Sequence, residues 1–184
     1  MARPPITSAR EVLTPVQARR LYAYNLAVLD RYVRAARRLP WSVANRRREI
    51  GHQSIFGTLV HILNVHEVWL GYILQGRNRD ADLEPLFTEA ARKPKDWASF
   101  APYYRRVRAA ILGYLADVTA RDLARPAKVF WMRGRFVASD GILQATLEQA
   151  HHLGEIIAVL WQRNTEPPEM TWIDVGAAAR RGGP

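Results

Sequence analysis

The sequence predicts an all-α protein, a four-helix bundle with a short hairpin or extended excursion between its third and fourth helices. Three observations predict this fold. Apolar residues recur at spacings of three and four, four such segments each run for about 20 residues, and strands do not alternate with helices. The 184 residues, 48% of them hydrophobic, suit one domain with a sizeable core.

The first two helices have clear start signals. The first begins at Thr14-Pro15-Val16-Gln17, which resembles a capping box with proline at the first helical position, and it ends before Pro40. The second begins after Ser54, a good N-cap, and continues to about Gly76. Because apolar residues occupy two of its faces, we expect this second helix to be buried nearly all round.

The last two helices are delimited in the same way. The third begins after Pro94, with Asp96 as its N-cap, and carries apolar residues as far as Val118. The fourth begins after Ser139-Asp140 and ends before Asn164. Together with the first two, they complete the set of helices that a bundle needs.

The connections and the chain ends differ from the helices in composition. Residues 76–94 form a polar connection with one short turn, and two β-prone runs within 128–137 flank Arg133-Gly134, which is typical of a hairpin. We therefore divide the chain into three parts: an N-terminal extension (1–13), the bundle domain (14–174) and a flexible tail (175–184).

Composition and charge exclude several classes of protein. The absence of cysteine excludes disulfides, thiolate metal ligands and a cysteine nucleophile. The net charge of +10 is large, but the arginines are scattered, with Arg46-Arg47-Arg48 the one run of three, so a solvated basic surface is favoured over a nucleic-acid interface. Polar residues interrupt the longest apolar region, Ile55 to Leu74, and no secretory signal is visible. We expect a cytoplasmic protein without a membrane partner.

The histidines fall in two neighbourhoods, and bundle interiors commonly hold metals through histidine and carboxylate side chains. In the fourth helix, Glu148 and His152 are four residues apart and can reach one point, but so can His151 and Glu155. Periodicity does not choose cleanly between the two pairs. His152 is the better candidate for burial because its neighbours on the helix are more apolar.

The second helix carries two further candidates. His61 shares an apolar face with Tyr72, whereas His66 lies on another face and is interpreted as a hydrogen-bonded interior residue. His52 precedes the helix and is interpreted as a loop residue. A site made from His61, Glu148 and His152 is one candidate among these, since such pairs on one helix also arise by accident.

The stretches Ser54–Leu70 and Thr146–Ile156 resemble two signature elements of the DinB/YfiT-like family, whose members are metal-binding four-helix bundles. The first element is a serine-led helix with a histidine, an acidic residue and Trp-Leu. The second is similar to the family's H-x-x-x-H-R-G-Q-I element. Tyr24-Asn25 and Asn164–Pro168 agree in order and spacing, so the resemblance covers roughly Val16 to Asp174.

The resemblance implies a metal site made by His61, Glu148 and His152. Glu148 stands where the commonest pattern has histidine, which is similar to the mycothiol-dependent maleylpyruvate isomerase branch. Leu153 stands where the family often has arginine, which leaves the role of that arginine open. The implied cofactor is a divalent ion, zinc first and nickel or iron next, with three protein ligands and an open position. Because the chain lacks cysteine, any reactive thiol would come from a low-molecular-weight cosubstrate.

These features predict a metal-dependent enzyme, a thiol-dependent S-transferase, an isomerase or a hydrolase, that acts on a small molecule and forms a homodimer. His151 and Tyr72 are candidate acid-base or orienting groups beside the metal. One alternative is a non-catalytic helical dimer with a structural or vestigial metal site, because fold does not imply function. A more remote alternative is a basic nucleic-acid-binding protein, although nucleic acid is not the expected partner.

Overall fold

The computed structural model describes residues 12–88 and 93–173. The N-terminal extension predicted for 1–13 and the tail predicted for 175–184 lie almost entirely outside these ranges. The elements, in chain order, are α1 (Pro15–Arg37), α2 (Trp41–Ala44), α3 (Ile55–His66), the π-helical η1 (Glu67–Ile73), α4 (Asp80–Thr88), α5 (Trp97–Asp117), α6 (Ala120–Leu123), β1 (Pro126–Ala127), β2 (Phe136–Val137) and α7 (Asp140–Trp161).

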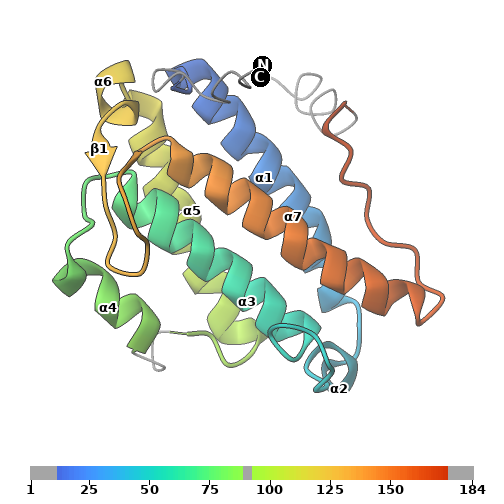
Figure 1. The fold of residues 1–184 in the computed structure, drawn as a ribbon. Helices are drawn as coiled ribbons and strands as arrows, with labels where there is room; N and C mark the ends of the chain where they lie inside the picture. Colours follow the sequence, from blue (N-terminus) through green and yellow to red (C-terminus); the bar gives the residue numbers. More distant parts are fainter. Residues whose placement is uncertain (1–11, 89–92, 174–184) are drawn as a thin grey trace, which may run out of the picture.

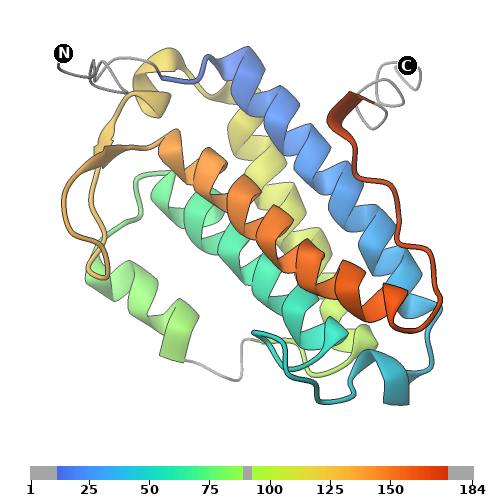
Figure 2. The ribbon, with the colours of Figure 1, turned by 45° about the vertical axis from the view of Figure 1, so that its right-hand side comes forward.

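Four long helical segments, α1, α3 with η1, α5 and α7, pack side by side as the predicted bundle (Figures 1 and 2). Helices α3 and α7 run in opposite directions, so that His61 meets His152 at one end and Trp69 meets Gly141 at the other. Helices α3 and α5 run in the same direction. The contact between Phe56 and Trp97, which lie early in the two helices, indicates this arrangement. The bundle therefore includes a crossover connection, which contains α4, rather than a simple up-down-up-down order.

Helix α1 starts where its sequence signal predicts. The Thr14 hydroxyl accepts a hydrogen bond from the Gln17 N–H at 3.2 Å, and the Gln17 side chain accepts one from the Thr14 N–H at 2.8 Å. This reciprocal pair satisfies two backbone donors that a helix start leaves free. Tyr22, Leu29 and Tyr32 then carry one face of the helix into the core.

The second predicted helix is one continuous helical segment, but its last two turns are π-helical. The Ser54 hydroxyl caps its start by accepting a hydrogen bond from the Gly57 N–H at 2.9 Å. The segment is buried nearly all round, as its two apolar faces predict. The π-helical turns begin at Glu67, a carboxylate that is 4% exposed and that accepts hydrogen bonds from Tyr103 Oη at 2.6 Å and Arg106 Nη1 at 2.8 Å. The added residue per turn changes which residues face α5 beyond this point.

The predicted starts of α5 and α7 are also confirmed, whereas the connections differ from prediction. Asp96 caps α5 through a 2.7 Å hydrogen bond from the Ser99 N–H. The connection after η1 contains the nine-residue helix α4 instead of a single turn. The hairpin pairs Pro126 with Val137 and Ala127 with Phe136, so its first strand lies before the β-prone run that suggested it.

After α7 the chain turns back along the outside of α1, where it forms a strap of residues 165–173 (Figures 1 and 2). Tyr24 donates a hydrogen bond from its hydroxyl to the Met170 carbonyl at 2.6 Å, and Tyr32 donates one to the Pro168 carbonyl at 3.0 Å. The strap covers part of the side of α1 that faces away from the bundle. In the described part of the chain, none of the helices has both the length and the apolar character needed to span a membrane.

Candidate metal centre

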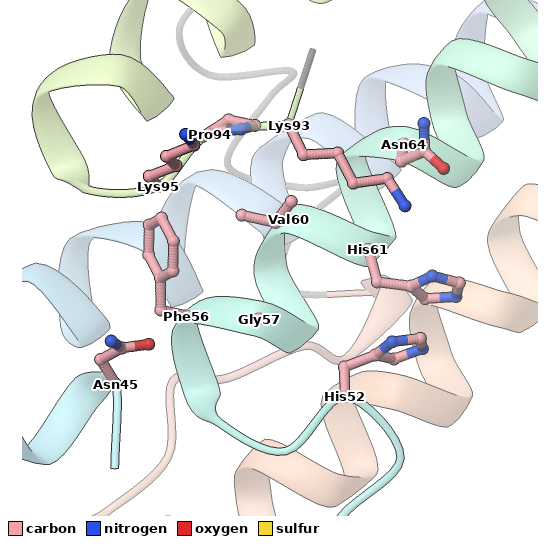
Figure 3. A pocket seen from close by; sticks show the side chains of 10 residues that line it. All are labelled: Asn45, His52, Phe56, Gly57, Val60, His61, Asn64, Lys93, Pro94 and Lys95. Atoms are coloured by element: carbon pink, nitrogen blue, oxygen red, sulfur yellow. The ribbon is translucent and has the colours of Figure 1, made fainter. Parts of the chain in front are cut away.

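His52 and His61, which are nine residues apart, converge with the distant His152 at the α3–α7 interface. The rings of His52 and His61 stack, with centroids 3.5 Å apart and planes 16° from parallel. The ring of His152 lies across them, 4.6 Å from His61 and 4.9 Å from His52. One nitrogen from each of the three residues can be chosen so that all lie within 4.8 Å of one another. Figure 3 shows the two stacked rings directed away from α3 toward α7.

Helix packing positions two of these side chains, and a loop positions the third. His61 lies in the middle of α3 and His152 in the middle of α7, on the faces where the two helices contact each other. His52 lies in the loop before α3, close to Gly57 in the first turn. A Cβ atom at position 57 would overlap the His52 carbonyl oxygen, so glycine allows this close approach.

The loop that carries His52 is held by its own backbone. The Arg48 N–H donates to the Gln53 carbonyl at 2.6 Å, and the Gln53 N–H donates to the Ile50 carbonyl at 2.9 Å. Gln53 has a φ of 64°, the left-handed conformation that such a tight turn requires. His52 therefore projects from an ordered turn that is anchored next to the start of α3.

Two carboxylates flank His152. Glu155 Oε2 lies 3.1 Å from His152 Nδ1, and Glu148 Oε2 lies 3.5 Å from His152 Nε2. Glu155 also accepts a hydrogen bond from the Gly51 N–H at 3.2 Å, which ties α7 to the loop of His52. An imidazole whose Nδ1 donates to a carboxylate presents Nε2 as a lone-pair donor, the usual arrangement of a metal-ligating histidine.

The electrostatics of the cluster favour neutral imidazoles. Burial, the charged forms of His52 and His152, and Lys93 lower the pKa of His61 from 6.5 to about 3. Burial and the charged form of His152 likewise lower the pKa of His52. Burial alone would raise the pKa of Glu155, but hydrogen bonds from His152 and the Gly51 N–H hold it below its ordinary value. At neutral pH, His52 and His61 thus offer neutral nitrogen donors near the ionised carboxylate of Glu155, and metal binding needs neutral imidazoles.

A pocket of about 500 Å³ opens beside His52 and His61. Exposed Lys93 and Lys95 stand on its rim, and Lys93 extends over the pocket toward Asn64 (Figure 3). On the other side of His152, Glu148 and His151 line a second pocket of about 350 Å³. Small molecules can therefore approach His52 and His61 through the first pocket and His152 through the second.

The structure brings together His61 and His152 of the predicted ligand set, and it buries His152 while leaving His151 exposed, as expected. Glu148 lies beside His152 but is outside the group formed with His52 and His61, so its ligand role stays a prediction. His151 forms a second group with His152 and Glu155.

Tyr72, the other predicted acid-base group, lies eleven residues beyond His61, about 16 Å along the helix. Its ring packs under the Arg77 guanidinium, 3.9 Å from the ring centroid, at the opposite end of the segment.

His52 is the site residue that the sequence interpretation missed. It is a loop residue, as predicted, but the loop folds back so that its ring reaches the ring of His61. The available signal was its place two residues before the N-cap Ser54, together with the glycine at position 57. Neither feature recurs at a helical spacing, so the apolar periodicity of the sequence does not reveal them.

Comparison with known proteins places the chain in a protein family. The family model of the DinB superfamily matches residues 26–156, a range that includes all three histidines. Among solved structures, a DinB-like protein from Bacillus cereus superposes with a TM-score of 0.62 at 17% identity, over 86% of this chain and 99% of that one. At this identity the likeness shows the fold alone. No curated protein matches the chain. Because the family model spans well over half of the sequence, the chain belongs to the DinB superfamily.

Proposed function

We propose that this protein is a metal-dependent enzyme whose divalent cation is held by His52, His61 and His152. The observation that carries the proposal is the convergence of these three imidazoles, within 4.8 Å of one another, at the edge of an open pocket. Two of the rings are held by helices and the third by an ordered turn, so the donor set is preorganised. Three protein ligands with an accessible further position are typical of catalytic rather than structural zinc sites.

The donor set suits the metal classes expected from the sequence. Neutral imidazoles bind zinc well, with nickel and iron(II) as the alternatives. Their lowered pKa values keep His52 and His61 deprotonated at neutral pH, so protons do not compete with the cation. Glu148, 3.5 Å from His152 Nε2, is near enough to serve as a fourth ligand or as a proton acceptor for a substrate beside the cation.

A divalent cation held by these residues would act as a Lewis acid and lower the pKa of a water or thiol that it binds. The residues around the cluster would bind and orient the substrate. Lys93 and Lys95 on the rim of the pocket favour a substrate with negative charge. Exposed His151 is placed to exchange protons with solvent on the side of the second pocket. Since the chain has no cysteine, a thiol-transfer reaction would use a low-molecular-weight thiol as cosubstrate.

Elemental analysis of the untagged protein tests the site. We expect about one equivalent of metal in the wild type and strong loss in His61→Ala and His152→Ala. His52→Ala and Glu148→Ala then separate the ligand set favoured by the geometry from the one expected from the sequence. Loss in His52→Ala with retention in Glu148→Ala supports the three-histidine set, and the reverse result supports the other. His151→Ala tests the second group, formed by His151 with His152 and Glu155, and should leave the metal in place if the three-histidine set holds it.

Turnover with a panel of thiols and electrophiles tests the enzymatic part of the proposal. Activity that needs added metal and disappears in His61→Ala supports it. Tight metal binding without turnover across the panel would favour the non-catalytic alternative, a helical dimer with a structural metal. The exposed apolar side chains of α7, among them Leu147 at 68% and Trp161 at 58%, support association of two chains in either case.

A further inference from the structure

A further cleft, separate from the two pockets described above, lies next to the histidine cluster and is strongly basic. Its volume is about 520 Å³, within the usual range for small-molecule sites, and it lies between the loop after α2 and the last turns of α7. Arg46, Arg47, Arg48 and Arg163 line it, with Glu49 as the one acidic residue among its lining. The arginine run of the sequence thus forms one wall of a cavity rather than a fully solvated surface.

Four arginines line this cleft, and Glu49 is the single carboxylate in its lining. Arg48 is half-buried and fixed, because its Nη1 donates to the Arg46 carbonyl at 2.8 Å and its Nη2 to the Val43 carbonyl at 2.9 Å. Burial, followed by the charges of Arg46 and Arg163, lowers the pKa of Arg48. Among the described residues, none of these arginines forms an ion pair with an acidic side chain. The cleft therefore concentrates positive charge that an anion would neutralise.

The negative charges near the cleft are smaller than the positive charge of its arginines. The C-terminus of α7 contributes roughly half a negative charge near the cleft, and Glu49 contributes one. The four positive charges of the arginines exceed the sum of these two negative contributions. Arginine also presents paired N–H donors in a planar fork that matches the oxygens of a phosphate or carboxylate.

The cleft and the histidine cluster share one structural support. The loop that carries Arg46–Arg48 also carries His52, and the Gly51 N–H between them is bound to Glu155 of α7. Val159, which lines the cleft, lies seven residues after His152 on the same helix, or about 10 Å along its axis. This separation is comparable with the length of a small metabolite.

We propose that the arginine cleft is an oxyanion-binding site that receives the phosphate or carboxylate group of a small molecule. The cleft is a binding site for the anionic end, and the other end of the same molecule reaches the histidine cluster. This second part rests on the proposed metal centre, whereas anion binding in the cleft does not. The substrate class would be a small molecule with a phosphate or carboxylate at one end and its reacting group at the other.

Calorimetric titration of the metal-free protein with inorganic phosphate, and separately with succinate, tests the site at constant ionic strength. We expect saturable binding of at least one probe, and the arm that binds identifies the anion as phosphate or carboxylate. The double variant Arg46→Gln with Arg163→Gln should weaken binding at least tenfold. Both side chains are exposed, so the fold should tolerate the change. Arg105→Gln, which removes an exposed arginine of α5 outside the lining of the cleft, is the control and should bind like the wild type.

Absence of saturable binding by both probes would overturn the proposal, as would an equal loss in Arg105→Gln. Binding of a short oligonucleotide alone, with a steep dependence on salt, would assign the basic surface to nucleic acid instead and also overturn it. Elemental analysis keeps the two proposals separate. The double variant should retain its metal, and if the wild type binds phosphate or succinate but no metal, the metal centre fails while the anion site stands.

Discussion

Glu155 Oε2 lies 3.1 Å from His152 Nδ1, and the other oxygen of the same carboxylate accepts the Gly51 N–H at 3.2 Å. One side chain therefore orients a candidate ligand on α7 and anchors the loop that presents His52. Because it touches the imidazole through Nδ1, it leaves Nε2 directed to the side where Glu148 lies.

Replacing Glu155 with glutamine should weaken metal binding by about 10- to 100-fold, because a neutral amide polarises the His152 ring less and holds it less firmly. Competition with a chromogenic chelator measures the affinity. Glu166→Gln, an exposed acidic residue beyond α7, is the control and should bind as the wild type does. Equal affinities in the Glu155 and Glu166 variants would count against an orienting role.

Gly57→Ala should lower the free energy of unfolding by about 1–3 kcal/mol, because the new methyl group overlaps the His52 carbonyl oxygen and forces the loop to move. It should also reduce metal affinity, since His52 moves with the loop. Gly113→Ala is the matched control: nothing lies within 4 Å of its Cβ position, and alanine in that helix should be neutral or stabilising. Urea unfolding and chelator competition measure the two effects, and an unchanged metal affinity would place His52 outside the ligand set.

Acidification should destabilise the protein partly through His66. Burial lowers the pKa of His66 from 6.5 to about 4, and the interaction of the ring with the Gln149 side chain offsets only part of this shift. The folded state therefore favours the neutral ring. Stability from this residue is complete above pH 6.5 and is lost as the pH falls toward 4.

Between pH 7.5 and pH 5, this single group should cost about 2 kcal/mol of unfolding free energy. The variant His66→Leu removes the titrating ring, so its unfolding free energy should depend less on pH over the same range. Urea unfolding of both proteins at the two pH values provides the comparison. Identical pH dependence in the two would show that the buried ring at 66 does not titrate as described.

Tyr103→Phe should lower the free energy of unfolding by about 1–3 kcal/mol, because it removes the 2.6 Å hydrogen bond to the buried carboxylate of Glu67. Tyr72→Phe is the matched control, and it should keep both stability and turnover. Its ring continues to pack under Arg77, and its hydroxyl lies far along the helix from the histidine cluster. Loss of turnover in Tyr72→Phe with the fold intact would restore Tyr72 as an acid-base group.

Leu147→Glu should convert a homodimer into monomers if two chains meet through the exposed apolar face of α7. Leu147 is 68% exposed, so the change should leave the folded monomer intact. Light scattering after size exclusion measures the mass. Leu112→Glu, at a 40% exposed leucine of α5, is the control and should not change it. A wild type that is monomeric at all concentrations would contradict the expected dimer.

The sequence was sufficient for the long helices because their ends carry local chemistry. Thr14, Ser54 and Asp96 each cap the helix that follows, and the capping hydrogen bonds involve residues only three positions away. Such short-range signals survive in any tertiary context. The apolar periodicity between the caps then identified the bundle.

The π-helical turns were not predictable, because their cause is tertiary. They begin at Glu67, whose partners Tyr103 and Arg106 lie more than 30 residues away in the sequence. His66 was expected to be a hydrogen-bonded interior residue, and the structure buries it beside Gln149, without a well-formed hydrogen bond to its ring nitrogens among the described residues. The packing of α3 against α1 and α7 buries the ring of His66 at this position.

Two of the three histidines of the candidate site could be predicted from the sequence, whereas the third depends on tertiary structure. His61 and His152 lie on long helices that periodicity locates, although the choice of His152 over His151 rested on its more apolar neighbours and on the family resemblance. His52 depends on a turn whose geometry is set by Gln53 in a left-handed conformation. No regular pattern in the sequence marks that turn, so its side chain could be placed only by the three-dimensional structure.

The strap along α1 also affects how the chain is made. The hydroxyl of Tyr24 is bound to a carbonyl 146 residues later, so α1 is fully covered only after a segment far downstream has been synthesised. During synthesis, that side of α1 is exposed to water and to chaperones. Truncation upstream of Pro168 should therefore leave α1 without the covering that the strap provides.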